Sequence, residues 1–186
     1  YNEFKEKGIH WGQDQKHVSL SDFIQDPDKH PLETPSGRIQ IRSEAFAAEG
    51  GSPIPVYRPF KVNKDYPLRL ITPKNRYRIH SQNYNIKWFR EREKHTMWIN
   101  PMDASPRGIK EGEMVEVSSS DGVLRIEAQL TEDMMPGVVC IQEGVWPRFE
   151  NGVEVNGSVN VLTSTEPTLP SYSSRTHSVI VQVGKL

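Results

Sequence analysis

The sequence predicts a mainly β protein built on a small closed β-barrel with short helices, and three features of residues 99–146 support this. Val115 and Val117 alternate with polar neighbours, which is the period of a half-buried strand. Asp121-Gly122 is typical of a two-residue type I′ hairpin turn, because both central positions of that turn need a positive φ. A Pro-Gly turn pair then precedes the fully apolar run 138–141, which predicts a buried strand. Strand, hairpin, strand, turn and buried strand together indicate a small barrel.

The other elements of this region follow from capping residues and alternation. Asp103 can cap a short helix that ends at Gly108, because Asp is favoured at the start of a helix and Gly at its end. Residues 97–99 are predicted as a short strand before this helix, and residues 131–135 can make one helical turn. The return strand of the hairpin places four apolar side chains on one face: Leu124, Ile126, Ala128 and Leu130.

Upstream of the barrel the chain is polar and shows little periodicity. Residues 39–41 alternate like a half-exposed strand, and a serine can cap a helix over residues 44–49. A proline-rich linker follows, extended because each proline fixes φ. Within the barrel region, residues 149–157 are predicted as a Gly/Asn-rich loop, and the last strand is expected over residues 178–183. We therefore predict an irregular N-terminal extension, residues 1–66, followed by a barrel domain, residues 67–186.

Composition narrows the classes of function. With 186 residues and a net charge of −1, the chain has no global reason to bind nucleic acid or an anionic membrane. No run approaches the roughly 18 apolar residues of a membrane span. The single cysteine, Cys140, excludes an intrachain disulfide and is expected to be a small core residue. The six histidines, at positions 10, 17, 30, 80, 95 and 177, form no HExxH motif, so a metal site is not expected.

Two polar features are candidates for a binding site. The first strand of the barrel is predicted to begin at Leu68 and Leu70. His80, Ser81 and Gln82 follow it, and their side chains can donate and accept the hydrogen bonds that a polar heterocycle or a phosphate needs. Asn160 lies between apolar neighbours, and burying an amide without partners costs ~1–3 kcal/mol. Either the backbone or a ligand must therefore satisfy it. From the residues alone, the chain is a β-barrel binding module with a polar mouth and no catalytic set of its own.

Two other functions remain open at this point. Residues 74–94 interleave basic and aromatic side chains, as single-stranded nucleic-acid binders do, although Glu91 and Glu93 dilute the charge. A solvated face or an anion site explains the same stretch. Alternatively, the barrel is an adaptor or peptide-binding module without a cofactor, which predicts an apolar groove rather than a polar cleft.

Four motifs carry a family resemblance: RIHSQ at 78–82, INPMDASPRGIKEGEMVEV at 99–117, GVVCIQEGVW at 137–146 and GSVNVLT at 157–163. With them, residues 68–183 resemble the C-terminal, molybdopterin-dinucleotide-binding domain of the dimethyl sulfoxide reductase family. Residues 23–44 are similar to the segment just before that domain. Within the family, the chain looks most like the anaerobic, membrane-complex type of catalytic chain.

The resemblance implies a six-stranded double-psi β-barrel of the aspartate-decarboxylase-like class. It also implies that loops at one end of the barrel hold a bis(molybdopterin guanine dinucleotide) cofactor. Asn160 would bond a pterin edge, and Arg78 or Arg175 would neutralise the phosphates of the dinucleotide. Carried over residue by residue, the cofactor-binding set is Thr72, Arg78, His80, Ser81, Gln82, Asn160, Arg175, His177 and Ser178.

The resemblance further implies that this chain is the C-terminal part of a bacterial molybdenum oxidoreductase. The chain begins at Tyr1 without Met, so we expect a piece of a longer protein. In the family the molybdenum ligand and, in many members, an iron–sulfur cluster lie upstream. The piece alone is therefore expected neither to turn over substrate nor to retain the cofactor. Implied partners are the upstream domains, an iron–sulfur electron-transfer subunit and a membrane anchor subunit, with neither nucleic acid nor direct membrane insertion. An exported or membrane-associated location is implied.

Overall fold

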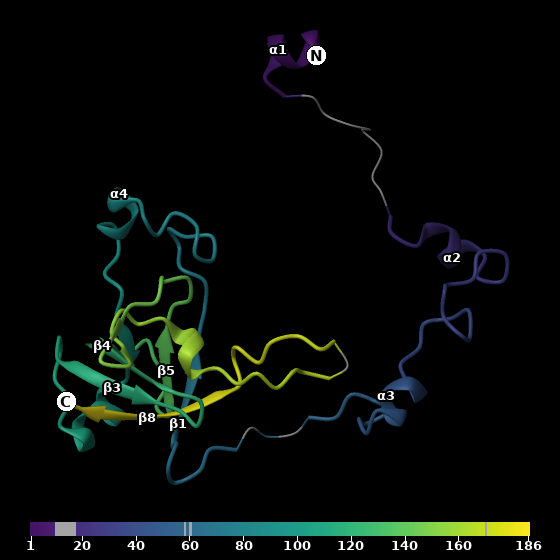
Figure 1. The fold of residues 1–186 in the computed structure, drawn as a ribbon. Helices are drawn as coiled ribbons and strands as arrows, with labels where there is room; N and C mark the ends of the chain where they lie inside the picture. Colours follow the sequence, from purple (N-terminus) through teal and green to yellow (C-terminus); the bar gives the residue numbers. More distant parts are fainter. Residues whose placement is uncertain (10–17, 58, 60, 170) are drawn as a thin grey trace. The chain divides into compact units, whose positions relative to one another are not determined.

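The computed structural model describes residues 1–9, 18–57, 59, 61–169 and 171–186, and the chain forms two compact units, residues 1–55 and 56–186 (Figure 1). The first unit holds three short helices: α1 (Asn2–Lys7), α2 (Ser21–Gln25) and α3 (Glu44–Ala48). As predicted, a serine caps α3, because the Ser43 hydroxyl accepts a hydrogen bond from the backbone N–H of Phe46 at 3.2 Å. None of the described residues of this unit is buried.

The strand predicted over residues 39–41 does not form. Ile39 and Ile41 are 67% and 78% exposed, and no strand pairs with them in the described part of the chain. Alternation stabilises a strand only when a neighbouring strand takes up its backbone hydrogen bonds and a core covers one face. This segment has neither, so the prediction was wrong.

The second unit is a closed barrel of six strands: β1 (Leu68–Ile71), β2 (Met97–Ile99), β3 (Met114–Ser118), β4 (Val123–Leu130), β5 (Val138–Ile141) and β8 (Val179–Lys185). The strands are hydrogen-bonded in the order β2-β5-β1-β8-β3-β4, and the pairing of β2 with β4 closes the ring. The β1–β5 and β2–β4 pairs are parallel, whereas the other neighbours are antiparallel. The predicted fold class, a six-stranded double-psi barrel with short helices, is confirmed.

Alternating apolar side chains fill the inside of this barrel. Val117 of β3 lies opposite Leu124 of β4 on one side and Val183 of β8 on the other. All three are buried in the core. Because full burial of such a side chain contributes about 1.5–3 kcal/mol, these layers are a main source of the barrel's stability.

Short elements surround the barrel: α4 (Lys87–Arg90), α5 (Pro101–Ala104), the 3₁₀ helices η1 (Ser105–Arg107) and η2 (Val159–Leu162), and the hairpin β6 (Phe149–Glu150)–β7 (Val153–Glu154). The hairpin lies beside β4 in a region predicted as a loop. Its turn residues Asn151 and Gly152 have φ values of 50° and 81°, as a type I′ turn requires. Among the described residues, no helix has the length and apolar character needed to cross a membrane.

The turn between β3 and β4 lies where it was predicted but has a different chemistry. Neither Asp121 nor Gly122 adopts a positive φ, so the turn is not of type I′. The backbone N–H of Ser119 donates to the Gly122 carbonyl at 2.9 Å, which leaves Ser120 and Asp121 as the central residues. A Cβ at Gly122 would lie 2.3 Å from the carbonyl oxygen of Val161. Glycine is therefore needed here for the close approach of η2.

Asn100 caps α5, whereas the sequence had predicted Asp103 as the cap. The Asn100 carboxamide accepts from a first-turn N–H at 2.8 Å and donates to the Met134 carbonyl at 2.6 Å. The Asp103 carboxylate instead accepts from the backbone N–H of Gly137 at 2.7 Å. Both residues thereby tie α5 to the turn before β5. Residues 131–135 form a turn rather than the predicted helical turn.

Candidate functional site

Three of the predicted site residues, His80, Ser81 and Asn160, line one pocket of about 400 Å³ in the barrel unit. They come from separate stretches of the chain: the loop after β1 and the first turn of η2. The segment after β5 completes the wall. The other lining residues of this site pocket are Glu143, Gly144, Val145, Trp146, Pro147, Ser158 and Val159.

Asn160 reaches the pocket in a way that the sequence did not indicate. Its apolar neighbours suggested a buried amide, but Asn160 is exposed while Val159 and Leu162 are buried. The 3₁₀ geometry of η2 explains this, because three residues per turn place adjacent side chains on different faces. The amide therefore pays no burial cost and lies at the pocket wall.

The loop that carries His80 and Ser81 is held close to the segment after β5. His80 has a φ of 53°, which is uncommon for a residue with a side chain. Gly144 opposite has a φ of 94°, and a Cβ there would lie only 1.9 Å from the His80 carbonyl oxygen. The two backbones can therefore approach this closely only because residue 144 is a glycine.

Arg78 links this loop to the segment after β5. It is 8% exposed, and its Nη2 donates to the Glu143 carbonyl at 3.2 Å, while its Nε has no partner in the described part of the chain. Burial lowers the pKa of the guanidinium, and the charges of Glu93 and Tyr84 oppose this shift. Arg78 thus connects the loop after β1 to the segment after β5 but does not line the site pocket itself.

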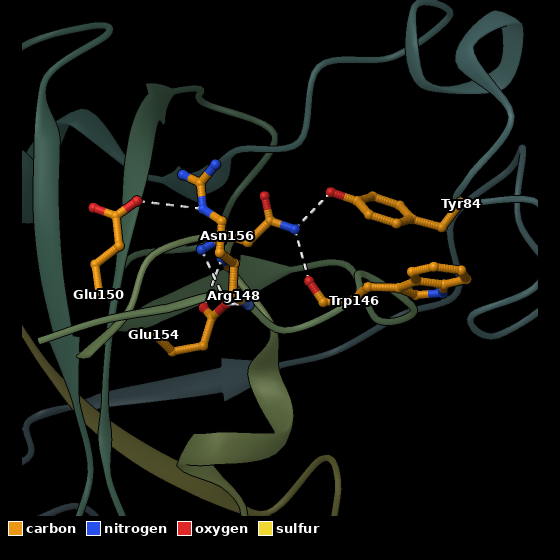
Figure 2. A network of polar contacts seen from close by, with 7 residues as sticks. Tyr84, Trp146, Arg148, Glu150, Glu154 and Asn156 are labelled. Atoms are coloured by element: carbon orange, nitrogen blue, oxygen red, sulfur yellow. Dashed lines mark hydrogen bonds and ion pairs between the residues drawn. The ribbon is translucent and has the colours of Figure 1, made fainter. Parts of the chain in front are cut away.

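A single buried carboxylate organises the opposite wall of the pocket (Figure 2). Glu154 is 0% exposed and accepts four backbone N–H groups. Its Oε1 takes those of Arg148 and Asn156 at 3.0 and 2.9 Å. Its Oε2 takes those of Gly157 and Ser158 at 2.7 and 2.8 Å. Glu154 therefore sets the course of the chain from the β6–β7 hairpin to η2.

Trp146, Asn156 and Tyr84 join this wall to the loop of His80 and Ser81. The Asn156 amide donates to the Tyr84 hydroxyl at 2.6 Å and to the Trp146 carbonyl at 2.7 Å (Figure 2). The Trp146 indole N–H donates to the Ser81 carbonyl at 2.9 Å. Its ring lies 6.0 Å from that of Tyr84. The three segments around the pocket are thus hydrogen-bonded to one another.

The remaining predicted residues lie elsewhere. Arg175 and Ser178 line a second pocket of about 290 Å³, and Arg175 pairs there with Glu166 at 2.9 Å. Leu162 of η2 lines this second pocket, so η2 contributes to both. Gln82 lines neither pocket; its backbone N–H bonds the Ile79 carbonyl at 3.0 Å.

Thr72 and His177 are hydrogen-bonded to each other and line neither of these two pockets. The Thr72 backbone N–H donates to His177 Nδ1 at 3.3 Å, and the Thr72 hydroxyl donates to the Thr176 carbonyl at 3.0 Å. Nδ1 is therefore the unprotonated ring nitrogen of His177. These bonds fasten the end of β1 to the segment before β8.

A second polar network fixes the far ends of the loop after β1. The Gln142 amide donates to Glu93 at 2.9 Å, and the Asn75 amide donates to both Gln142 and Glu93. Cys140 lies nearby in β5 and is buried, as predicted. Burial, with the charge of Glu93, raises the pKa of its thiol to about 11, so the thiol stays protonated at neutral pH.

Two lysines of the basic and aromatic stretch at residues 74–94 are paired with carboxylates. Lys87 pairs with Glu91 at 3.5 Å, and Lys94 pairs with Glu127. The Arg92 guanidinium lies 4.4 Å from the centre of the Trp88 ring. In the described part of the chain, no three His, Cys, Asp or Glu side chains gather as a metal site would require; His10 and His17 lie outside it.

His95 gives this region a pH dependence that can be measured. Burial lowers its pKa; a hydrogen bond between Nε2 and the Gly157 carbonyl and the charges of Glu154 and Glu93 oppose this shift, while Arg78 adds to it. In the unfolded chain the imidazole takes up a proton near pH ~6.5, before the folded form does. Stability should therefore fall as the pH decreases through that value, by at most about 1.4 kcal/mol per pH unit.

The measurement is urea denaturation at about pH 7.5 and about pH 5.5, a range that brackets the unfolded pKa. His95→Gln keeps a donor for the Gly157 carbonyl but does not titrate, so this variant should lose less stability than the wild type. Equal losses in the two proteins would contradict the assignment.

A closed barrel whose distant loops gather hydrogen-bonding side chains at one pocket has the architecture of a ligand-binding domain. Residues 68–178 match the family described as "Molydopterin dinucleotide binding domain". The chain belongs to this family of molybdopterin-dinucleotide-binding domains, as its motifs indicated.

Two curated relatives and one solved structure place the chain more closely. It is 37% identical to dimethyl sulfoxide reductase DmsA of Escherichia coli (strain K12), over 100% of this chain and 25% of that protein. It is 33% identical to a trimethylamine-N-oxide reductase of Haemophilus influenzae, over 92% of this chain and 23% of that protein. Acetylene hydratase from Pelobacter acetylenicus has the same fold, with a TM-score of 0.71 at 20% identity, over 87% of this chain and 25% of that one. The chain spans about a quarter of the length of the curated relatives it matches.

Proposed function

We propose that the site pocket binds one arm of a molybdopterin guanine dinucleotide and that the chain does so as the C-terminal part of a bacterial molybdenum oxidoreductase. One observation carries the proposal: His80, Ser81 and Asn160, from distant parts of the sequence, meet at one pocket in a chain of this family. When bound, the cofactor supplies two-electron redox chemistry at molybdenum. The residues of this chain orient the cofactor and keep water from it.

The pocket fits such an arm in both size and chemistry. Its volume of about 400 Å³ lies within the usual range of small-molecule sites. A pterin or a guanine presents donors and acceptors around a flat ring, and Ser81 and Asn160 offer a hydroxyl and an amide to meet them. The second pocket, with Arg175 and Ser178, offers a cation and hydroxyls for another part of the same molecule. Thr72, Gln82 and His177 would then act through the loops that they fasten.

We propose the following setting for the whole protein. Residues 67–186 are the cofactor-binding barrel, and residues 1–66 are an extension from the preceding domain. The upstream domains supply the molybdenum ligand and any iron–sulfur cluster, so the isolated chain does not retain the cofactor. The substrate is a small oxo-compound, as the names of the relatives suggest. An iron–sulfur subunit and a membrane anchor are the partners, and the complex is exported or membrane-associated.

The test uses the full-length protein that carries this chain, with Ser81→Ala and Asn160→Ala combined. Two lost hydrogen bonds of ~0.5–1.5 kcal/mol each should weaken cofactor retention about tenfold. Molybdenum and pterin per protein are measured after gel filtration. The matched control replaces two exposed residues outside both pockets, Asn85→Ala with Ser105→Ala, and should keep its full load. Equal loads in the two variants would reject the site.

A further inference from the structure

Glu143 is a site residue that the sequence motifs did not single out. It lies two residues after β5, lines the site pocket, and its side chain is 24% exposed. No described residue donates a hydrogen bond to its carboxylate, and its Oε1 is buried. The His80 imidazole lies beside it, with Nδ1 3.2 Å from Oε1.

A carboxylate that accepts no hydrogen bond from the protein can face only certain ligand groups. An ionised carboxylate only accepts hydrogen bonds, so the ligand must bring donors. A phosphate brings negative charge and acceptors, and both are repelled at this place. Because Oε1 is buried, one carboxylate oxygen is open to a ligand, and an N–H group there gives a charge-assisted hydrogen bond. An amino group on a heterocycle supplies such a donor.

We propose that Glu143 recognises the 2-amino group that pterin and guanine share, and so selects the base portion of the cofactor. This inference rests on the proposed function, because it names the part of the same ligand that the pocket takes. His80 is a positioning residue that holds Oε1, which leaves Oε2 for the ligand. Gly144 allows the loop of His80 to come close enough for this contact.

The test measures binding of four probes to the full-length, cofactor-free protein by calorimetry. Guanosine monophosphate is compared with inosine monophosphate, which lacks the amino group, and pterin with lumazine, which carries an oxygen in its place. The wild type should bind the amino member of at least one pair about tenfold more tightly, which corresponds to the loss of a charge-assisted hydrogen bond. The pair that shows the preference identifies the source, guanine or pterin.

Glu143→Gln should bring the two members of that pair to about equal affinity, because a carboxamide presents one acceptor and one donor. Glu143→Asp keeps the carboxylate and should keep the direction of the preference. The control Glu150→Gln removes an exposed carboxylate of β6 and should leave the preference unchanged. Thermal melting of each variant establishes that it is folded.

Three results would overturn the inference. Wild-type protein that binds both members of each pair equally well removes the role of Glu143 and leaves the proposed function standing. The same holds if the preference persists in Glu143→Gln. Failure of the wild type to bind any of the four probes overturns the inference and the proposed function together.

Discussion

Glu154→Ala is expected to lower the free energy of unfolding by about 3 kcal/mol or more, because four backbone N–H groups lose their acceptor at once. Each buried donor left without a partner costs ~1–3 kcal/mol, reduced where the loop relaxes toward water. Since the bonded groups lie on either side of the β6–β7 hairpin and directly before η2, the wall that carries Asn160 should lose its shape. Urea denaturation measures the stability, and binding of guanosine monophosphate measures the pocket.

Glu154→Gln separates the charge of this residue from its shape. Each carboxylate oxygen accepts two N–H groups, so either orientation of a glutamine amide places its NH₂ against two donors. This variant should therefore be destabilised as well, by about 2 kcal/mol. The matched control is Glu150→Gln on the same hairpin, whose exposed pair with Arg148 is worth little. Wild-type stability in Glu154→Gln would show that the four bonds do not hold the wall.

Gly144→Ala is expected to cost about 3 kcal/mol, from positive-φ strain of about 1–2 kcal/mol and overpacking of about 1–3 kcal/mol. The new Cβ would lie 1.9 Å from the carbonyl oxygen of His80, so the loop after β1 must move away. Moving it separates His80 and Ser81 from the segment after β5. Binding of guanosine monophosphate should fall together with the stability.

Gly137→Ala is the matched control for this substitution. Gly137 has a φ of 84°, close to the 94° of Gly144, but no atom lies within 4 Å of a Cβ placed there. This variant should therefore cost only the strain of positive φ, about 1–2 kcal/mol, and leave binding intact. If the two glycine variants behave alike in denaturation and in binding, close backbone contact does not determine the pocket.

The strands of the barrel could be predicted because each is indicated by a pattern among residues that are close together in the sequence. Alternation in residues 114–118 and 123–130 fixed two strands and their inward faces, and the apolar run 138–141 fixed a third. The same alternation misled at residues 39–41, where no partner strand exists. An alternating pattern predicts which face of a strand would be buried. Whether that face is buried depends on other elements of the fold packing against it.

The parts that were missed depend on contacts between distant residues. Gly122 was assigned to a type I′ turn, but it is a glycine because η2 passes over it. The type I′ turn that does exist, Asn151-Gly152, carries an equally strong sequence signal but lies in the stretch predicted as a loop. Glu154 looked like one more polar residue of that loop. A polar loop with several backbone N–H groups to satisfy favours a buried acceptor, and an acidic residue in its middle was the available signal.

Some residues of the candidate site could likewise be predicted from local patterns, whereas others depend on contacts with distant residues. The HSQ tripeptide and Asn160 were found because neutral hydrogen-bonding side chains stand out between apolar strands, and two of the three tripeptide residues line the pocket with Asn160. Glu143 and Trp146 lie in the family motif at 137–146, whose sequence alone does not indicate that they line a pocket. Their roles follow from His80 and Ser81, which are more than 60 positions away.

The position of β8 between β1 and β3 determines when the binding pocket can first exist during synthesis. Leu68 of β1 pairs with Val181, and Val117 of β3 pairs with Val183, so each strand lacks its partner on this side until β8 is made. A ribosome must therefore release residues 179–185 before the ring can close. Until then the loops around the site pocket have no common frame, so the pocket can form only after the barrel is complete.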